Sequence, residues 1–190
     1  VYKRQLLTGA TGFIGAHLAK RLLGQGDTVV TIAHDTYPPM SRSLDFLGIK
    51  DRIFYAHGSI TDPELPKRVV ADYEIEQIYH LAAFGLVRRS DVSPVPVWRT
   101  NIEGTWNVME AARDCDAAVL YMSTDKVYGD HGNIPCREDF ALKGVNVYDC
   151  SKACGDMIAK SYHSVYGLKL ATIRMCNAYG PADLDPRLIP

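Results

Sequence analysis

The sequence predicts a doubly wound α/β domain, in which helices cover both faces of a parallel sheet. Three observations support this prediction. Short apolar runs alternate with longer segments of helical periodicity. The first apolar run leads directly into a glycine-rich turn, which opens the first helical segment. The chain has 190 residues, 47% hydrophobic and 23% charged, which is enough for one domain with a substantial core.

The patterns predict six strands and five helices. The strands are expected at Gln5–Thr8, Thr28–Ala33, Arg52–His57, Gln77–Leu81, Ala117–Ser123 and Lys169–Met175. The helices are expected at Phe13–Gly24, Ser41–Leu47, Pro63–Tyr73, Val95–Cys115 and Val147–Tyr166. Because helix-length segments connect successive strands, the connections are right-handed crossovers and the sheet is parallel. This arrangement is typical of the Rossmann type.

We expect residues 1–190 to form one dinucleotide-binding domain. After the sixth strand the sequence continues through Asn177–Pro181 and ends at Pro190 without a closing helix. An enzyme with this architecture needs further structure to cover its substrate. We therefore expect a fragment from which the substrate-binding domain is largely absent.

Composition and charge exclude several classes of partner. The net charge is −1 and no long basic run is present, so no nucleic-acid or membrane surface is expected. No apolar stretch approaches the roughly 20 residues of a membrane span, and the N-terminal residues lead at once into a strand, so no signal peptide is expected. The five cysteines form no Cys-x-x-Cys pattern. We interpret them as reduced thiols of a cytoplasmic protein, without a metal site.

The glycine-rich turn is the first candidate site. Gly9, Gly12 and Gly15 form G-x-x-G-x-x-G between the first strand and the first helix. Such a turn lets the backbone approach a pyrophosphate, and the helix N-terminus offers free N–H groups to its charge. A tight turn without a ligand is the alternative. If the turn binds a dinucleotide, the expected contacts are Gly9, Thr11, Gly12, Phe13, Ile14 and Gly15.

The ends of the second and third strands carry candidates for the adenosine half of the cofactor. Asp35 can accept the ribose hydroxyls of NAD and repel the extra phosphate of NADP, or it can cap the following turn. Ser59 and Ile60 stand where the adenine edge would lie. Ser59 either bonds there or begins the cap of the next helix.

The end of the fourth strand is the third candidate segment. Leu81, Ala82 and Ala83 either form a wall past which the cofactor runs or simply pack the strand. His80 is expected to be a buried, hydrogen-bonded histidine rather than a catalyst. Asn101 is polar within an apolar helical pattern and either braces the active site or faces solvent.

Tyr148 and Lys152 are the candidate reacting pair. At i and i+4 they share one face of a helix. A nearby ammonium favours the phenolate and lowers the tyrosine pKa, so the phenol can take a hydroxyl proton while hydride leaves the same carbon. Thr124, at a strand end, can bond the same oxygen. A surface pair is the alternative for Tyr148 and Lys152 alone.

Asp125 and Lys126 directly follow Thr124. Two ionisable residues at the end of a central strand are costly unless they have a role. Simple oxidation needs only threonine, tyrosine and lysine, so the added pair indicates a second proton transfer. An ion pair that closes a loop is the alternative.

Taken together, these segments resemble the extended short-chain dehydrogenase/reductase family, within it the NAD-dependent epimerases and dehydratases that act on nucleotide-sugars. The resemblance covers nearly the whole chain and is carried by Thr8–Gly15, His80–Ala83, Thr100–Thr105, Ser123–Gly129, Tyr148-x-x-x-Lys152 and Arg174–Pro181. Two further segments, Leu86-Val87-Arg88-x-Ser90 and Asp185–Pro190, resemble CDP-glucose 4,6-dehydratases in particular.

The resemblance implies a lyase that oxidises a hexose at C4, eliminates water across C5–C6 and returns hydride to C6, with NAD as cofactor. It assigns C4 oxidation to Tyr148, Lys152 and Thr124. Lys126 would be the C5 base, where many dehydratases have glutamate, and Asp125 the acid. For the substrate it implicates Phe84, Thr124, Asn177 and Arg187.

The sequence departs from the family pattern at two places. Ser59 stands where aspartate is usual, and Phe84-Gly85 replaces the Gln-Pro of CDP-glucose dehydratases. A 4-epimerase of the same family is the second hypothesis, and a catalytically silent NAD-binding module is the third. The resemblance also implies a homodimer, in which the helices Val95–Cys115 and Val147–Tyr166 form a four-helix bundle with the partner.

Overall fold

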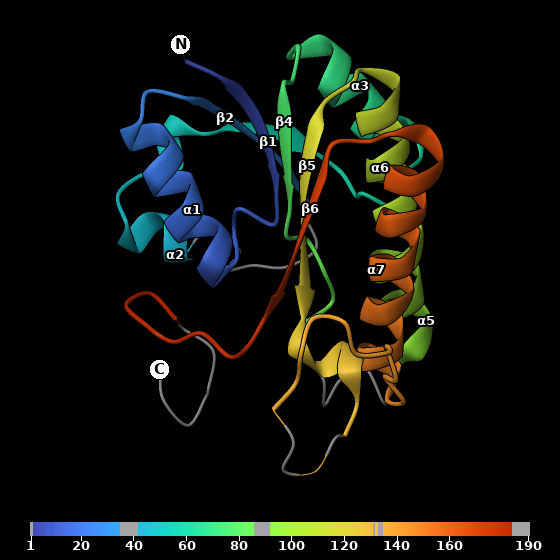
Figure 1. Cartoon of the computed structure of the whole chain (residues 1–190). Helices are drawn as coiled ribbons and strands as arrows, with labels where there is room; N and C mark the ends of the chain where they lie inside the picture. The colour runs from blue at the N-terminus through green and yellow to red at the C-terminus, as the bar shows by residue number, and fades with distance from the viewer. Residues whose placement is uncertain (1, 35–41, 86–91, 131, 133–134, 184–190) are drawn as a thin grey trace.

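The computed structural model describes residues 2–34, 42–85, 92–130, 132 and 135–183 (Figure 1). Six parallel strands form one sheet in the order β3-β2-β1-β4-β5-β6. They are β1 Arg4–Thr8, β2 Thr28–Ala33, β3 Phe54–His57, β4 Gln77–His80, β5 Ala118–Thr124 and β6 Leu170–Met175. This strand order confirms the predicted Rossmann-type fold.

Helices cover both faces of the sheet. On one face lie α1 Phe13–Gly24 and α2 Arg42–Phe46, and on the other lie α3 Glu64–Asp72, α6 Gly104–Asp114 and α7 Val147–Tyr166 (Figure 1). The shorter elements are α5 Pro94–Trp98, the π-helical segment η2 Arg99–Glu103, and the 3₁₀ turns η1 Lys50–Arg52 and η3 Asp125–Tyr128. None of the helices within the described residues is long and apolar enough to cross a membrane.

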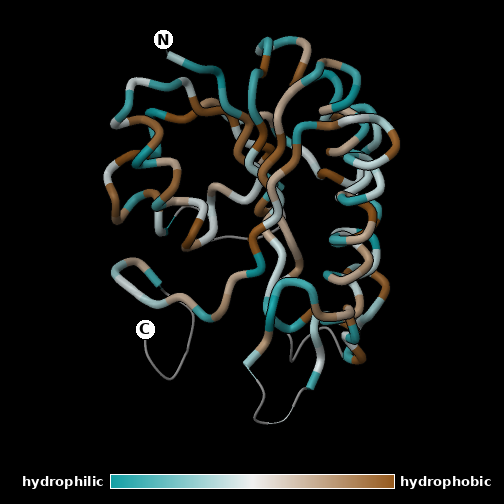
Figure 2. Tube along the Cα trace, viewed as in Figure 1, coloured by the Kyte–Doolittle hydropathy of each residue, from teal (hydrophilic) through white to brown (hydrophobic). Residues whose placement is uncertain are grey.

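Two apolar cores lie on opposite faces of the sheet. Successive strand residues point to opposite faces, so Leu6 joins the core under α3, α6 and α7, whereas Leu7 joins the core under α1 and α2. Val30 and Val29 divide in the same way. Figure 2 shows the resulting band of hydrophobic residues along the central strands. Because the central strands are buried on both faces, their sequences are almost continuously apolar and do not alternate between apolar and polar residues.

The helix predicted at Val95–Cys115 is present as one continuous helical run, Pro94–Asp114, but it contains a π-helical segment that the sequence did not predict. The α-helical turns of α5 and α6 are separated by the five-residue π-helical segment η2. Within η2, both polar atoms of the Asn101 amide bond the backbone of Phe84, and the Asn101 carbonyl accepts a bond from Thr105 Oγ1. These bonds account for the local widening, which periodicity alone could not predict. The third strand also begins later than expected, because Arg52 belongs to η1.

The strand order reverses between β1 and β4. Chain connections leave this point in opposite directions, and in folds of this type ligands bind in a crevice at the carboxyl ends of the strands there. After β6 the chain passes beneath α1 and α2 (Figure 1). His17 Nε2 lies 2.7 Å from the Pro181 carbonyl oxygen, and Ser43 Oγ donates to the Ala182 carbonyl at 2.9 Å. The segment after β6 therefore borders the same edge of the sheet as the glycine-rich turn.

Candidate active site

The glycine-rich turn packs tightly against the end of β4. Gly9 has a φ of +79°, and a Cβ there would lie 2.8 Å from the Ala82 nitrogen. A Cβ on Gly15 would lie 2.1 Å from the Gly9 carbonyl oxygen. Both positions therefore require glycine, because a side chain would force α1 away from the strands. Gly12 N donates to Gly9 O at 3.1 Å and closes the turn.

The N-terminus of α1 fits a pyrophosphate. Gly12 is the N-cap of this 12-residue helix, and the first turn contains no acidic residue. The free N–H groups and the helix dipole therefore favour an anion at this end. Thr11, Phe13 and Ile14 are half-buried around the same turn. The residues present thus fit the phosphate-binding role expected from the sequence, at the β1–β4 crevice.

The expected adenosine contacts are only partly described. Asp35 lies outside the described residues. The Ser59 hydroxyl accepts from Thr61 N at 3.2 Å and lies 2.9 Å from Thr61 Oγ1, so it forms the local turn before α3. Ile60 buries its side chain in the core, and its carbonyl accepts from Asn107 Nδ2. These bonds favour the structural interpretation of Ser59.

His80 is a buried, hydrogen-bonded residue, as the sequence predicted. Its Nδ1 lies 2.7 Å from Thr8 Oγ1, and its Nε2 lies 3.1 Å from Thr105 Oγ1. Burial, assisted by the charge of Lys152, lowers the His80 pKa to about 3. The neutral ring joins β1, β4 and α6 by hydrogen bonds. Thr8 Oγ1 also accepts from Ala82 N, which fixes the small-residue wall of Leu81, Ala82 and Ala83 beside the crevice.

Lys152 is almost completely buried against β5. Its Nζ donates to the Met122 carbonyl at 2.6 Å and lies 4.5 Å from the centre of the Tyr121 ring. Burial lowers the Lys152 pKa to about 7, while the charge of Asp156 acts in the opposite direction. A lysine with such a pKa exchanges protons readily near neutral pH.

Tyr148 differs from the sequence-based expectation. Burial, followed by the charges of Asp149 and Asp125, raises the Tyr148 pKa, and a hydrogen bond with Thr124 opposes this. The expected lowering by Lys152 was wrong for this arrangement, because the lysine donates to Met122 and its own burial disfavours its charge. Sequence spacing places the two residues on one helix face but does not reveal the cost of burying them.

Thr124 and Asp125 meet Tyr148 at the end of β5. Thr124 Oγ1 donates to Asp125 Oδ1 at 3.1 Å and accepts from Lys126 N at 3.4 Å. The threonine is therefore the N-cap of η3, the 3₁₀ turn that carries Asp125 and Lys126. The structure thus brings together Thr124, Asp125 and Tyr148, three residues that the sequence singled out.

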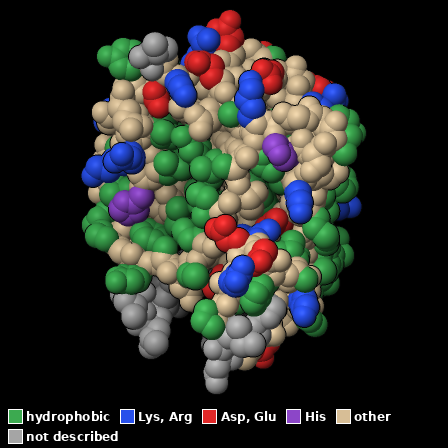
Figure 3. Space-filling model, in the orientation of Figure 1, with side chains coloured by type: hydrophobic (Ala, Val, Ile, Leu, Met, Phe, Trp, Pro, Cys, Tyr) green, Lys and Arg blue, Asp and Glu red, His purple; other side chains and the backbone are tan. Residues whose placement is uncertain are grey.

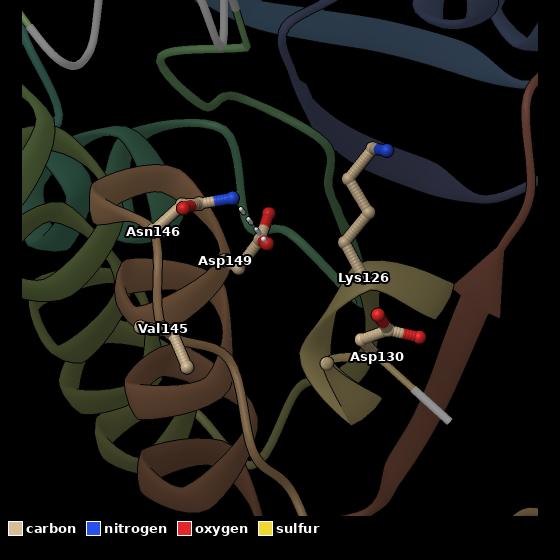
Figure 4. Close-up of a pocket in the computed structure, with 6 residues that line it drawn as sticks. Lys126, Asp130, Val145, Asn146 and Asp149 are labelled. Atoms are coloured by element: carbon tan, nitrogen blue, oxygen red, sulfur yellow. Dashed lines mark hydrogen bonds between the residues drawn. The ribbon is translucent and has the colours of Figure 1, made fainter. Parts of the chain in front are cut away.

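Lys126 points into a neighbouring cavity of about 370 Å³. Figure 4 shows it extending from η3 beside Asn146 and Asp149, with Asp130 on the same side of the cavity as Lys126. Asn146 Nδ2 donates to Asp149 Oδ2 at 3.3 Å across the start of α7. The cavity therefore has a cationic side chain at η3 and a buried carboxylate on the helix that carries Tyr148.

Asn101 braces the active-site helix, which was one of the two alternatives open from the sequence. Its Nδ2 donates to Ser151 Oγ at 2.8 Å, and Ser151 Oγ donates to the Tyr148 carbonyl at 2.7 Å. The same amide holds the backbone of Phe84 after β4. Asn101 thus couples the segment after β4 to the first turn of α7. Sequence analysis missed Ser151, although its place within Tyr148-x-x-x-Lys152 was a usable signal.

Arg174 on β6 is a second residue whose role the sequence analysis missed. Its guanidinium donates to both oxygens of Asp156, at 2.9 and 3.0 Å. It also donates to Tyr128 Oη and to the Glu138 carbonyl, each at 2.8 Å. Ser123 Oγ is a further donor to Asp156. Asp156 continues the spacing of Tyr148 and Lys152 by one more turn, which was the available signal.

Three substrate candidates from the sequence remain, and two of them lie within the described residues. Phe84 is half-buried after β4, and Asn177 is exposed just beyond β6. Arg187 lies outside the described residues. Figure 3 shows hydrophobic side chains across the middle of one face, with acidic and basic side chains gathered below them. The described residues therefore form a polar site at the carboxyl edge of the sheet, beside an apolar surface.

Comparison with known proteins agrees with this geometry. The family model described as GDP-mannose 4,6 dehydratase matches residues 6–190. A dTDP-glucose 4,6-dehydratase of Streptomyces griseus is 38% identical over 192 residues, covering 97% of this chain and 57% of the relative. UDP-glucuronate 4-epimerase 4 of Arabidopsis thaliana is 32% identical, covering 93% of this chain and 42% of that protein.

A solved structure shares the fold closely. DesIV, a dTDP-glucose 4,6-dehydratase from Streptomyces venezuelae crystallised with NAD, has a TM-score of 0.89 and 34% identity, covering 98% of this chain and 60% of that chain. This chain spans less than two thirds of the length of these relatives. The family match and these identities show that the chain belongs to the GDP-mannose 4,6 dehydratase family of nucleotide-sugar dehydratases and epimerases.

Proposed function

We propose that the full-length protein is an NAD-dependent nucleotide-sugar 4,6-dehydratase. The observation that carries the proposal is the position of Asp125, which bonds Thr124 and acts electrostatically on Tyr148. A 4-epimerase needs the tyrosine and lysine but has no use for an added acid and base. The close match to dehydratases crystallised with NAD supports the cofactor.

The residues divide the proton transfers among them. Tyr148 takes the proton of the C4 hydroxyl, and Thr124 orients that oxygen. Lys126, acting as the neutral amine, removes the C5 proton, and Asp125, acting as the protonated carboxyl, gives its proton to the departing C6 hydroxyl, which leaves as water. Bound NAD would supply the hydride chemistry of the cycle, as the acceptor for C4 and the donor for C6. Gly9, Gly12 and the α1 N-terminus would hold its pyrophosphate, and Asp35 its adenosine ribose.

Two nucleotide-sugars are the first substrates to test. The segments after β4 and at the chain end resemble those of CDP-glucose dehydratases, which favours CDP-glucose. A relative that is 38% identical to this chain is named for dTDP-glucose. Phe84 lines the route to the sugar in either case, and its amide is held by Asn101.

Lys126→Met in the full-length protein separates dehydration from epimerisation. The variant keeps an unbranched chain but removes the amine, so C4 oxidation should persist while exchange of the C5 proton with deuterated solvent is lost. General-base loss predicts a fall of about 100- to 10,000-fold in dehydration. Mass spectrometry of the sugar and the absorbance of reduced cofactor measure the two steps.

The matched control is Lys160→Met, which removes an exposed lysine from α7 away from the cavity. It should dehydrate at the parent rate. If Lys126→Met dehydrates the sugar at close to the parent rate, Lys126 is not the base. If the parent oxidises a sugar without C5 exchange, the epimerase hypothesis replaces the dehydratase.

We also propose that the protein forms a homodimer through α6 and α7. Val97 and Met109 are buried in the core, but Trp106 on α6 is 43% exposed. On α7, Met157 is 56% exposed. Exposed apolar side chains on adjacent helices favour burial against a partner.

Sedimentation at micromolar concentration tests this proposal. We expect a dimer for the parent and a monomer for Trp106→Glu. Phe46→Glu, which changes an exposed apolar residue of α2 on the opposite face, should remain dimeric. A parent protein that sediments only as a monomer would contradict the proposed bundle.

A further inference from the structure

The 3₁₀ turn η3 carries both groups that the proposed elimination needs, yet neither of them is buried. Asp125 is half-buried and Lys126 is exposed, whereas the next two residues, Val127 and Tyr128, are buried. Side chains three residues apart lie on the same side of a 3₁₀ helix. Tyr128 therefore lies on the same side of the turn as Asp125, and contacts that fix its ring also restrain the proposed acid.

Arg174 on β6 holds Tyr128 by a direct hydrogen bond. Its Nη1 donates to Tyr128 Oη at 2.8 Å, and its guanidinium carbon lies 5.1 Å from the centre of the same ring. The same nitrogen donates to the Glu138 carbonyl at 2.8 Å. One contact is to the last residue of η3 and the other is to the segment that follows it. The arginine therefore restrains the turn from its carboxyl side.

The arginine is itself held in place by a buried carboxylate. Its Nε and Nη2 donate to the two oxygens of Asp156 at 2.9 and 3.0 Å, and the Asp156 side chain is only 3% exposed. Ser123, which pairs with Arg174 across β5 and β6, donates to the same carboxylate at 2.8 Å. A bidentate pair fixes the orientation of the guanidinium as well as its position. Tyr128 is therefore anchored to α7, the helix that carries Tyr148.

We propose that Arg174 and Tyr128 are positioning residues for the elimination step. They hold the acid and the base of η3 in place relative to α7, by contacts that do not involve the sugar. This inference rests on the proposed function, because only elimination uses the two groups of η3. C4 oxidation uses Thr124 on β5 and Tyr148 on α7. A loosened turn should therefore slow elimination and leave oxidation close to the parent rate.

Tyr128→Phe in the full-length protein tests this role, because it removes the hydroxyl that Arg174 bonds and keeps the buried ring. We expect elimination to fall by roughly 10- to 100-fold, since a misplacement of about 1 Å can have an effect of that size. Exchange of the C5 proton and mass spectrometry of the sugar measure this step. KM and the rate of C4 hydride transfer should stay close to those of the parent, so reduced cofactor should accumulate. Equal slowing of oxidation and elimination would overturn the proposal.

Two further variants check the assignment. Tyr162→Phe also removes a tyrosine hydroxyl, one that donates to the Glu110 carboxylate on α6, and it should leave both steps at the parent rate. Arg174→Lys keeps the charge but lacks the planar fork of the guanidinium, and it should slow elimination selectively. Because Tyr128→Phe breaks a contact that Arg174→Lys has already lost, it should add little in that background. Independent losses that multiply in the double variant would overturn the coupling.

Hydrogen exchange of the ligand-free full-length protein measures the anchoring without any activity. Amides of residues 125–129 should exchange faster in Tyr128→Phe than in the parent, and at the parent rate in Tyr162→Phe. Unchanged exchange of this segment in Tyr128→Phe would overturn the proposal. If exchange is faster but the parent eliminates water from no sugar that it oxidises, the proposed function is refuted while the anchoring of η3 stands.

Discussion

Replacement of Tyr148 with Phe is expected to lower turnover of the full-length protein by about 100- to 10,000-fold, the range typical of a lost general acid or base. The Tyr148 pKa responds to Thr124 and to the charge of Asp125, and in the proposed mechanism this phenol takes the proton of the C4 hydroxyl. Phenylalanine keeps the ring and its packing but removes the phenolic oxygen that takes the C4 hydroxyl proton in the proposed mechanism. Reduced cofactor should then fail to accumulate when substrate is added, which stopped-flow absorbance measures.

Tyr166→Phe is the control for this change. Tyr166 lies on the same helix and is 58% exposed, and its ring packs at a tilt against that of Tyr162. It should leave turnover within twofold of the parent, on the order of the small effects of surface substitutions. Near-normal turnover by Tyr148→Phe would refute the assignment of the phenol as the group that begins the reaction.

Arg174→Met is expected to lower the free energy of unfolding by about 3–5 kcal/mol, the usual cost of leaving a buried charge without its partner. The Asp156 side chain is only 3% exposed and would lose both guanidinium bonds. The segment after η3 would also lose its bond to β6. Urea denaturation of this chain measures the change, and the melting temperature should fall by roughly 10 °C.

Arg137→Met provides the comparison, because Arg137 forms an ion pair with Asp139 in which both side chains are mostly exposed. An exposed pair contributes about 0–1 kcal/mol. Equal destabilisation by the two variants would show that the Asp156 contacts are not what holds β6 to α7. A selective loss in Arg174→Met would support the role of this arginine in joining β6, η3 and α7.

Local patterns in the sequence predicted most of the architecture. The bounds of α1, α7 and β2 agree with expectation, because each has a clear start and stop in residue type. Glycine at C′ of α7 has a φ of +71°, which terminates that helix as the pattern predicts. The glycine-rich turn was also predicted correctly. Its glycines are needed because close contacts with the end of β4 leave no room for side chains.

The tertiary contacts were harder to predict. Asn101 and Ser151 lie fifty residues apart, and nothing in either local pattern reveals their bond. Arg174 and Asp156 meet only after β6 docks beside β5. The predicted lowering of the Tyr148 pKa was wrong for a related reason. Burial raises this pKa, and burial depends on the whole fold rather than on the spacing of two residues.

The π-helical segment η2 has a consequence for comparing and engineering this fold. An α-helix turns about 100° per residue, so one added residue rotates everything on one side of the insertion relative to the other. The apolar stripes of α5 and α6 are thus out of phase, although their residues are contiguous in sequence. If α6 replaced the corresponding helix of a relative, the hydrogen bonds of Asn101 would be preserved only if residues 99–103 were transferred as well. Helix α6 and the π-helical segment η2 therefore have to be transferred together.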